Sequence, residues 1–205
     1  MTLIEKLIKE EVLKSSQIIE AFQEIQRADF VPKEVKAGIG SDQGVNDYNE
    51  PLSIGFGQTI SQPYTVALML ELLQPQPGDK ILDIGSGSGW QTALLCYIVG
   101  SQGHVWALEV IKELKEIGQS NVEKYGFQNV DFLNQSGLTG FTKEAPFDKI
   151  IAAAAGDNIP TAWPNQLAEG GRLVCPAGDS LWLLKKEKGQ IKKKEYPGFL
   201  FVPLV

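Results

Sequence analysis

Apolar residues near the start of the chain recur every three or four positions, which is the spacing of one face of a helix. They are Leu3, Leu7 and Ile8, followed by Ile18, Ile19, Phe22 and Ile25. This spacing predicts two helices, near residues 2–13 and 15–27, with Pro32 as the stop. Residues 33–60 show no sustained period, and we interpret them as a functional or partly mobile stretch that is able to close as a lid.

Pro63 stands where a first helical turn tolerates proline, and the apolar run after it predicts a helix to about Leu73. Strands and helices then alternate. We expect strands at 79–85, 103–109, 129–134, 147–155 and 172–178, helices at 89–99 and 111–126, and a helical crossover at 158–171 broken by Pro164. This alternation predicts a doubly wound α/β fold, a mostly parallel sheet covered on both faces. Residues 179–205 contain strands around a turn at Gly189 and predict an antiparallel addition at one sheet edge.

The composition narrows the function classes. The chain has 205 residues, 43% of them hydrophobic, and a net charge of −6. This excludes a disordered chain and argues against a general nucleic-acid binder, which needs a basic face. The two cysteines, Cys96 and Cys175, are expected to be buried free thiols in a reducing compartment. No Cys/His cluster has metal-ligand spacing, no run is long enough to cross a membrane, and the start lacks the apolar region of a signal peptide.

We therefore expect a cytoplasmic monomer with one domain. Within it, residues 1–60 would form N-terminal helices and a loop on the substrate side, 61–178 the cofactor-binding α/β core, and 179–205 the C-terminal strands. Six lysines at 185, 186, 188 and 192–194 are interpreted as a solvated hairpin, with steering of acidic peptides as the alternative.

The stretch "ILDIGSGSGW" carries the first chemical signal. Asp83 ends a predicted strand, and Gly85, Gly87 and Gly89 follow it with Ser86 among them. A dinucleotide fingerprint needs its third glycine where this chain has Trp90. The spacing acidic-x-G-x-G-x-G is that of the first motif of S-adenosylmethionine methyltransferases. A glycine turn lets a ligand lie against the backbone, and an acid nearby suits a cationic cofactor.

A second acid, Glu109, ends the next predicted strand. The ends of neighbouring strands in a doubly wound sheet meet at the ligand crevice, so its carboxylate is placed to accept ribose hydroxyls. Cofactors with a pyrophosphate use an acid at this place too, so Glu109 alone does not discriminate between them.

Longer stretches carry a more specific resemblance. "PLSIGFGQTISQPYTVALMLELL" with "GDKILDIGSGSGWQTALL", together with "RADFVP", "PFDKII", "IPTAWPNQLAEGGRLVCPAG" and "FVPLV", resembles the protein-L-isoaspartate (D-aspartate) O-methyltransferase family from about Arg27 to the last residue. The resemblance implies a class I S-adenosylmethionine-dependent methyltransferase fold with N-terminal helices. It also implies methylation of the α-carboxylate of L-isoaspartyl residues in damaged proteins and peptides; the ester then collapses to a succinimide that can reopen to aspartate.

The resemblance assigns roles to individual positions. Ser61 corresponds to the active-site serine, and Thr59 lies beside it at both cofactor and substrate. Ile54 and Ile60 are expected at the substrate. The cofactor contacts would be Asp83, Gly85, Ser86, Gly87, Gly89, Glu109, Ser136 and Gly137.

The chemistry suits these residues. A carboxylate with a pKa of about 4 is ionised at neutral pH and needs no general base. The protein must align it with the methyl group and exclude water, and hydroxyls can hold it without forming an ion pair. We therefore expect Thr59 and Ser61 to orient an anion. Ser61 also precedes a helix, so an N-cap role is the alternative or additional interpretation.

Two segments depart from the family pattern. "NDYN" at 46–49 replaces A-Y-x-D, and "NQSG" at 134–137 places Gln135 and Ser136 where the family has G-D. These departures keep open a related methyltransferase that acts on another carboxylate or a specialised peptide. A non-catalytic module that binds the cofactor and, more distantly, an NAD-dependent enzyme also stay open.

Overall fold

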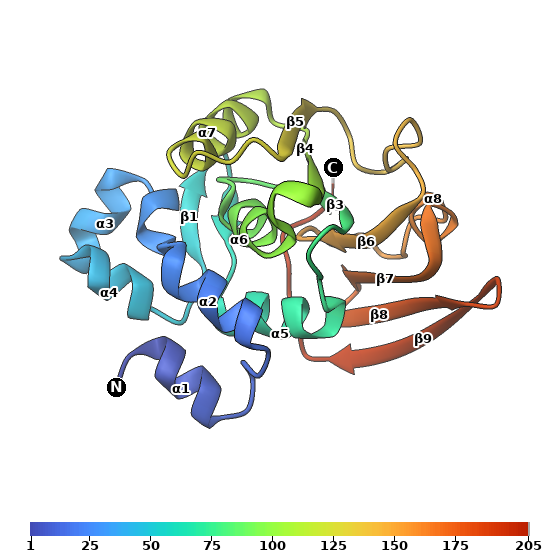
Figure 1. The fold of residues 1–205 in the computed structure, drawn as a ribbon. Helices are drawn as coiled ribbons and strands as arrows, with labels where there is room; N and C mark the ends of the chain where they lie inside the picture. Colours follow the sequence, from blue (N-terminus) through green and yellow to red (C-terminus); the bar gives the residue numbers. More distant parts are fainter. Residues whose placement is uncertain (205) are drawn as a thin grey trace.

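The computed structural model describes residues 1–204, and Val205, the end of the "FVPLV" stretch, lies outside the described residues. One sheet of seven strands runs through the molecule (Figure 1). Its strands are β3 (Lys80–Ile84), β4 (His104–Glu109), β5 (Val130–Asn134), β6 (Phe147–Ala152), β7 (Leu167–Ala177), β8 (Ser180–Glu187) and β9 (Gln190–Pro197). The order in space is β5-β4-β3-β6-β7-β8-β9. The pairs from β5 to β7 are parallel, and β8 and β9 join antiparallel, which confirms the predicted fold class.

Helices precede the sheet and connect its strands. They are α1 (Leu3–Lys9), α2 (Ser16–Glu24), the 3-10 helix η1 (Arg27–Phe30), α3 (Lys33–Ile39), α4 (Asp42–Asp47), α5 (Pro63–Leu73), α6 (Trp90–Val99), the 3-10 helix η2 (Gly100–Gln102), α7 (Lys112–Glu123) and α8 (Ala162–Asn165). A separate hairpin of β1 (Leu52–Gly55) and β2 (Gln58–Ile60) lies between α4 and α5. Thr2 and Glu5 form a capping box that begins α1, and Pro63 opens α5 as expected.

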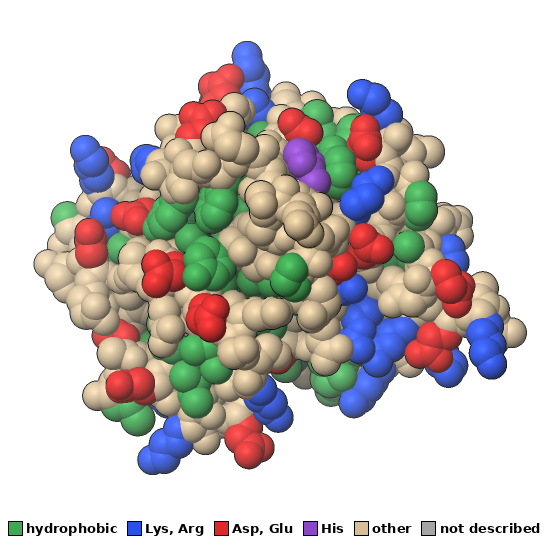
Figure 2. Space-filling model, in the orientation of Figure 1, with side chains coloured by type: hydrophobic (Ala, Val, Ile, Leu, Met, Phe, Trp, Pro, Cys, Tyr) green, Lys and Arg blue, Asp and Glu red, His purple; other side chains and the backbone are tan. Residues whose placement is uncertain are grey.

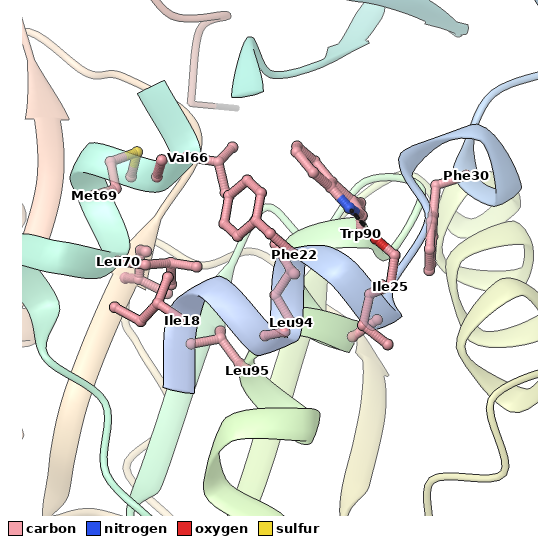
Figure 3. Packing of buried hydrophobic residues seen from close by; sticks show 14 of the residues in the cluster. Ile18, Phe22, Ile25, Phe30, Val66, Met69, Leu70, Trp90, Leu94 and Leu95 are labelled. Atoms are coloured by element: carbon pink, nitrogen blue, oxygen red, sulfur yellow. Dashed lines mark hydrogen bonds between the residues drawn. The ribbon is translucent and has the colours of Figure 1, made fainter. Parts of the chain in front are cut away.

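The two faces of the sheet are covered differently. On one face, buried side chains of α2, α5, α6 and α7 share one apolar cluster with the sheet. Figure 3 shows Phe22 of α2 beside Trp90 of α6. Their rings pack edge to face, with 5.6 Å between the ring centroids. The other face is covered by the short α8, with Trp163 fully buried, and by the loop between β5 and β6. The N-terminal helices are therefore part of the same core as the sheet.

Two predictions of local structure are wrong, and one segment is more regular than its sequence pattern indicates. Residues 33–60 contain α3, α4 and the β1–β2 hairpin, although each of these elements is too short to show a period. The crossover at 158–171 is helical only over α8, because residues from Leu167 onward already extend β7. The first helix ends at Lys9 rather than near residue 13, and Glu11 beyond it has a positive φ of 57°.

The chain after β9 returns to the sheet. The N–H groups of Gly198 and Phe199 donate to the carbonyl of Asp179. Further along, Ala155 N–H donates to Val202 O, and Leu204 N–H donates to Ala155 O. Residues 198–204 therefore lie across the carboxyl ends of the parallel strands, where Figure 1 places the C-terminus.

The surface is charged unevenly. Figure 2 shows Lys and Arg side chains gathered over the β8–β9 hairpin at the lower right. The six lysines predicted as a hairpin do lie there, and Lys192 pairs with Glu187. Within residues 1–204, no helix has the length and apolar character needed to cross a membrane. The same residues include no group of His, Cys, Asp and Glu able to hold a metal ion.

Candidate active site

The glycine stretch forms the turn between β3 and α6. Gly85, Gly87 and Gly89 all have positive φ, at 77°, 53° and 92°. At Gly89 an added Cβ would lie 2.8 Å from the carbonyl oxygen of Gly118 in α7, so only glycine fits there. The turn packs against α7, and its residues 85–88 line a pocket.

Most N–H groups of this turn are already used inside the protein. Gly85 and Ser86 donate to Leu108 O, Gly89 donates to Ser86 O, and Gly87 donates to the carboxylate of Glu109. A pyrophosphate needs such groups free, and it would meet the negative charge of Glu109. The turn therefore does not suit a dinucleotide, and the NAD-dependent alternative loses its structural basis.

Glu109 ends β4 at the floor of the pocket with only 6% of its surface exposed. One carboxylate oxygen accepts from Gly87 N–H and the other from Ile111 N–H, both at 2.9 Å. These two bonds fix the carboxylate plane, and each oxygen keeps a further lone pair for a ligand hydroxyl.

Ser86 provides a direct test of whether a ligand fits this pocket. Its hydroxyl is buried and has no hydrogen-bond partner, although Ser86 is one of the pocket-lining residues. A buried polar group without a partner is costly. A ligand that carries polar groups and lies along the turn would satisfy it, so the residues fit the nucleoside portion of S-adenosylmethionine.

The structure separates the predicted cofactor residues into two sets. Those that line the pocket are Gly85, Ser86, Gly87, Glu109, Gly137 and Thr59. Asp83, Gly89 and Ser136 are not among its lining residues. Ser136 instead accepts a long bond of 3.4 Å from Leu138 N–H.

Asp83 is fully buried and serves the fold. Its carboxylate accepts from the hydroxyl of Thr92 at 2.6 Å and from the amide of Gln91 at 2.8 Å. Burial is the main cause that raises the pKa of Asp83 to about 6. Asp83 therefore ties β3 to the first turn of α6, and the expected direct attraction of a cationic cofactor is not what its contacts show.

The predicted substrate residues gather on the opposite side of the same pocket. Ile54, Thr59, Ile60 and Ser61 all line it. Four residues, Thr59, Ser61, Ala153 and Val202, also line a second groove, here called the outer groove. Its other walls are Asn49, Pro51, Gln62, Tyr64, Thr65 and residues 197–201. Thr59 and Ser61 thus stand where the pocket and the outer groove meet.

Ser61 does not cap the helix that follows it. The N-cap residue of α5 is Gln62, which makes no side-chain cap bond. Asn49 takes over this task, because its side-chain oxygen accepts from Tyr64 N–H at 3.0 Å. Within residues 1–204 no side-chain hydrogen bond involves the hydroxyl of Thr59 or Ser61. Both hydroxyls are therefore available to a ligand.

Sequence reasoning missed the contribution of the C-terminal segment. Val202, Pro203 and Leu204 line the pocket, and Phe199 and Leu200 line the outer groove. The signal was present in "FVPLV", which resembles the family, but nothing in that stretch says that it folds back over the strand ends.

The sequence also matches a known protein family. The sequence model of the protein-L-isoaspartate (D-aspartate) O-methyltransferase family matches residues 1–205. The chain belongs to this family.

The chain is similar to other proteins over nearly its whole length. It is 38% identical to a protein-L-isoaspartate O-methyltransferase of Methanopyrus kandleri, over 99% of this chain and 89% of that one. A second relative of that name in Archaeoglobus fulgidus is 40% identical, over 96% of this chain and 89% of its own. A solved protein-L-isoaspartate O-methyltransferase superposes with a TM-score of 0.86 at 30% identity, over 98% of this chain and 64% of that one. A Plasmodium falciparum structure described as a putative member, solved with S-adenosyl-L-homocysteine, has a TM-score of 0.85 at 22% identity and covers 99% and 96%; it supports the fold.

Proposed function

We propose that this chain transfers a methyl group from S-adenosylmethionine to the α-carboxylate of L-isoaspartyl residues in damaged proteins and peptides. The observation that carries the proposal is the meeting of two cavities at Thr59 and Ser61. A transfer enzyme needs its two reactants to approach through one opening, and these two side chains line that opening.

The cofactor side holds its ligand with few charges. S-adenosylmethionine, when bound, supplies the electrophilic methyl group. Glu109 would accept the ribose hydroxyls, and Ser86 and Gly87 would line the nucleoside. Ile54 packs on the turn, where an added Cβ on Gly87 would lie 3.2 Å from its terminal carbon, and it forms an apolar part of the pocket wall. Apolar side chains beside the reacting groups help to keep water away from the transfer.

The substrate side offers neutral donors to an anion. Within the described chain, no charged side chain lines the outer groove. The hydroxyls of Thr59 and Ser61 would orient the carboxylate while leaving its electrons available to attack. The chemistry asks for placement rather than proton transfer, because the nucleophile is already ionised.

The alternative of another carboxylate substrate rested on the departures at 46–49 and 134–137. The first departure is absorbed within this chain, because Asn49 caps α5 from the position where the family pattern has an acid. The second leaves Gly137 at the pocket and Ser136 away from it. These contacts favour the isoaspartyl substrate. Retention of both hydroxyls and of Glu109 argues against a non-catalytic module.

The first test compares two peptides that differ only in an L-aspartyl or an L-isoaspartyl linkage, with methyl-labelled cofactor. We expect base-labile label on the isoaspartyl peptide alone. Ser61→Ala should lower kcat/KM by about 100-fold, the usual effect of removing one orienting donor. Ser53→Ala is the matched control, because Ser53 belongs to the hairpin that directly precedes Ser61 and lines neither cavity. Equal labelling of both peptides, or equal rates for the two variants, would contradict the proposal.

We also propose that the chain acts as a single-domain cytoplasmic monomer without a nucleic-acid partner. The shared core of N-terminal helices and sheet supports one folding unit. The net charge of −6 and the two buried free cysteines are consistent with this setting.

A further inference from the structure

Arg27, the first residue of η1, is a buried arginine with an unusual set of partners. It is only 2% exposed, and its guanidinium donates to four backbone carbonyls and to no side chain. The bonds go to Val45 at 3.4 Å, Tyr48 at 2.7 Å, Glu50 at 2.7 Å and Ser61 at 3.2 Å. A single side chain thus joins η1 to the end of α4, the entry to β1 and the loop before α5.

No carboxylate within residues 1–204 forms an ion pair with Arg27. Its guanidinium lies 5.6 Å from the ring centre of Trp90. Burial lowers the pKa of Arg27 to about 10, which still leaves it charged at neutral pH. Burying an unpaired charge is costly, so its retention calls for a task that a neutral side chain cannot perform.

The contact with Ser61 indicates that task. The Ser61 hydroxyl has no partner within the described chain, so its direction depends on the backbone that carries it. The Ser61 carbonyl is held by the same fork that holds Tyr48 and Glu50. A planar guanidinium fixes several carbonyls relative to one another, which a lysine or glutamine cannot do.

We propose that Arg27 is the positioning residue of the transfer step: by holding the backbone of Ser61, it aims the serine hydroxyl at the substrate carboxylate. This inference rests on the proposed function, and it adds Arg27, which lines neither the pocket nor the outer groove. Arg27 touches no substrate, so it acts only through the loop that it clamps.

A double-mutant cycle tests the coupling. Arg27→Gln should lower kcat by about 30-fold, since small misplacements of reacting groups cost up to about 100-fold. The affinity for S-adenosylhomocysteine, measured by calorimetry, should change less than about threefold, because Arg27 makes no hydrogen bond to Glu109 or to the glycine turn. In the Ser61→Ala background, Arg27→Gln should have almost no further effect on kcat. A merely structural role would instead multiply the two losses, and that result would overturn the proposal.

The chain offers a matched control, because its only other arginine is Arg172. Arg172 also donates to a backbone carbonyl, that of Leu72 at 2.9 Å at the end of α5. Arg172→Gln should leave kcat within about twofold of the wild type. Arg27→Lys is made in parallel, because it keeps the charge and part of the contacts, and should recover part of the lost kcat. Equal kcat losses for Arg27→Gln and Arg172→Gln would count against the inference.

Hydrogen exchange separates this inference from the proposed function. Arg27→Gln and Arg27→Lys should speed amide exchange in residues 59–64 and leave β4 unchanged, whereas Arg172→Gln should leave both unchanged. Failure of the wild type to label the isoaspartyl peptide would refute the substrate assignment alone. Unchanged exchange at 59–64 in both Arg27 variants would refute the positioning role whatever the substrate is.

Discussion

The proposed cofactor side of the active site lies at the carboxyl ends of β3, β4 and β6, whereas the proposed substrate side lies on a two-stranded hairpin and loops. The first is held mainly by backbone: the turn after β3 donates to Leu108 O and presses against Gly118. The second is held by side chains that reach backbone groups, from Arg27 and Asn49. A sheet keeps the cofactor side rigid, and a few replaceable contacts leave the substrate side open to change.

The comparison predicts that the largest effect comes from the one side chain that anchors the cofactor side. Glu109→Gln should weaken binding of S-adenosylhomocysteine by about 100-fold, or ~3 kcal/mol, because the amide nitrogen would face an N–H group where the carboxylate accepted one. Calorimetric titration measures this. Glu113→Gln, on an exposed face of α7, is the control. A change below about fivefold would show that Glu109 is not the anchor.

The close packing of the glycine turn predicts the next effect. Gly89→Ala should lower the free energy of unfolding by about 3 kcal/mol, because its Cβ meets Gly118 O and its φ is positive. Gly126→Ala shares the positive φ but has open space around it, so about 1 kcal/mol is expected. Urea unfolding of both variants measures the difference. Equal losses would mean that strain in φ, rather than contact with α7, keeps the turn in shape.

The buried carboxyl group of Asp83 predicts that the free energy of unfolding depends on pH. Its pKa of about 6 in the folded protein lies above the usual value of about 3.9, so the folded state binds more protons between these values. The free energy of unfolding should therefore fall as pH rises through this window and level off above it. The wild type should lose about 2 kcal/mol between pH 4 and 7 relative to Asp83→Asn. Parallel slopes for the two proteins in urea unfolding would contradict the assignment.

The smallest effect is expected on the substrate side. Asn49→Ala removes the bond to Tyr64 N–H and should cost about 1 kcal/mol of unfolding free energy, as lost helix caps do. It should lower kcat/KM several-fold and leave cofactor affinity unchanged. Asn49→Asp should behave like the wild type, because a carboxylate accepts the same bond. A change in cofactor affinity with Asn49→Ala would show that the two sides are not independent.

Much of the sheet could be predicted from the sequence because each buried strand is a short apolar run bounded by glycine or polar residues. "DKILDIG" and "GHVWALE" lie where the structure has β3 and β4. The stretch 33–60 could not be predicted, because α3, α4, β1 and β2 are too short for periodicity and depend on contacts with distant residues. Arg27 illustrates this dependence, since its partners lie 18 to 34 residues away.

The site was predicted unevenly for a similar reason. Motif spacing predicted Gly85, Gly87 and Glu109 as cofactor contacts, and all three line the pocket. It could not reveal that the Asp83 side chain turns into the protein toward Thr92. Nor could it show that Asn49 rather than Ser61 caps α5, because that cap crosses 15 residues of chain.

The lysines of β9 affect how this protein associates with other polypeptides. The strand lies at the end of the sheet, so its outer backbone groups are open to pairing with another chain. Lys192, Lys193 and Lys194 put positive charge on both of its faces. Such charges discourage the addition of a further strand, so β9 can remain an open edge without recruiting unfolded segments of other polypeptides.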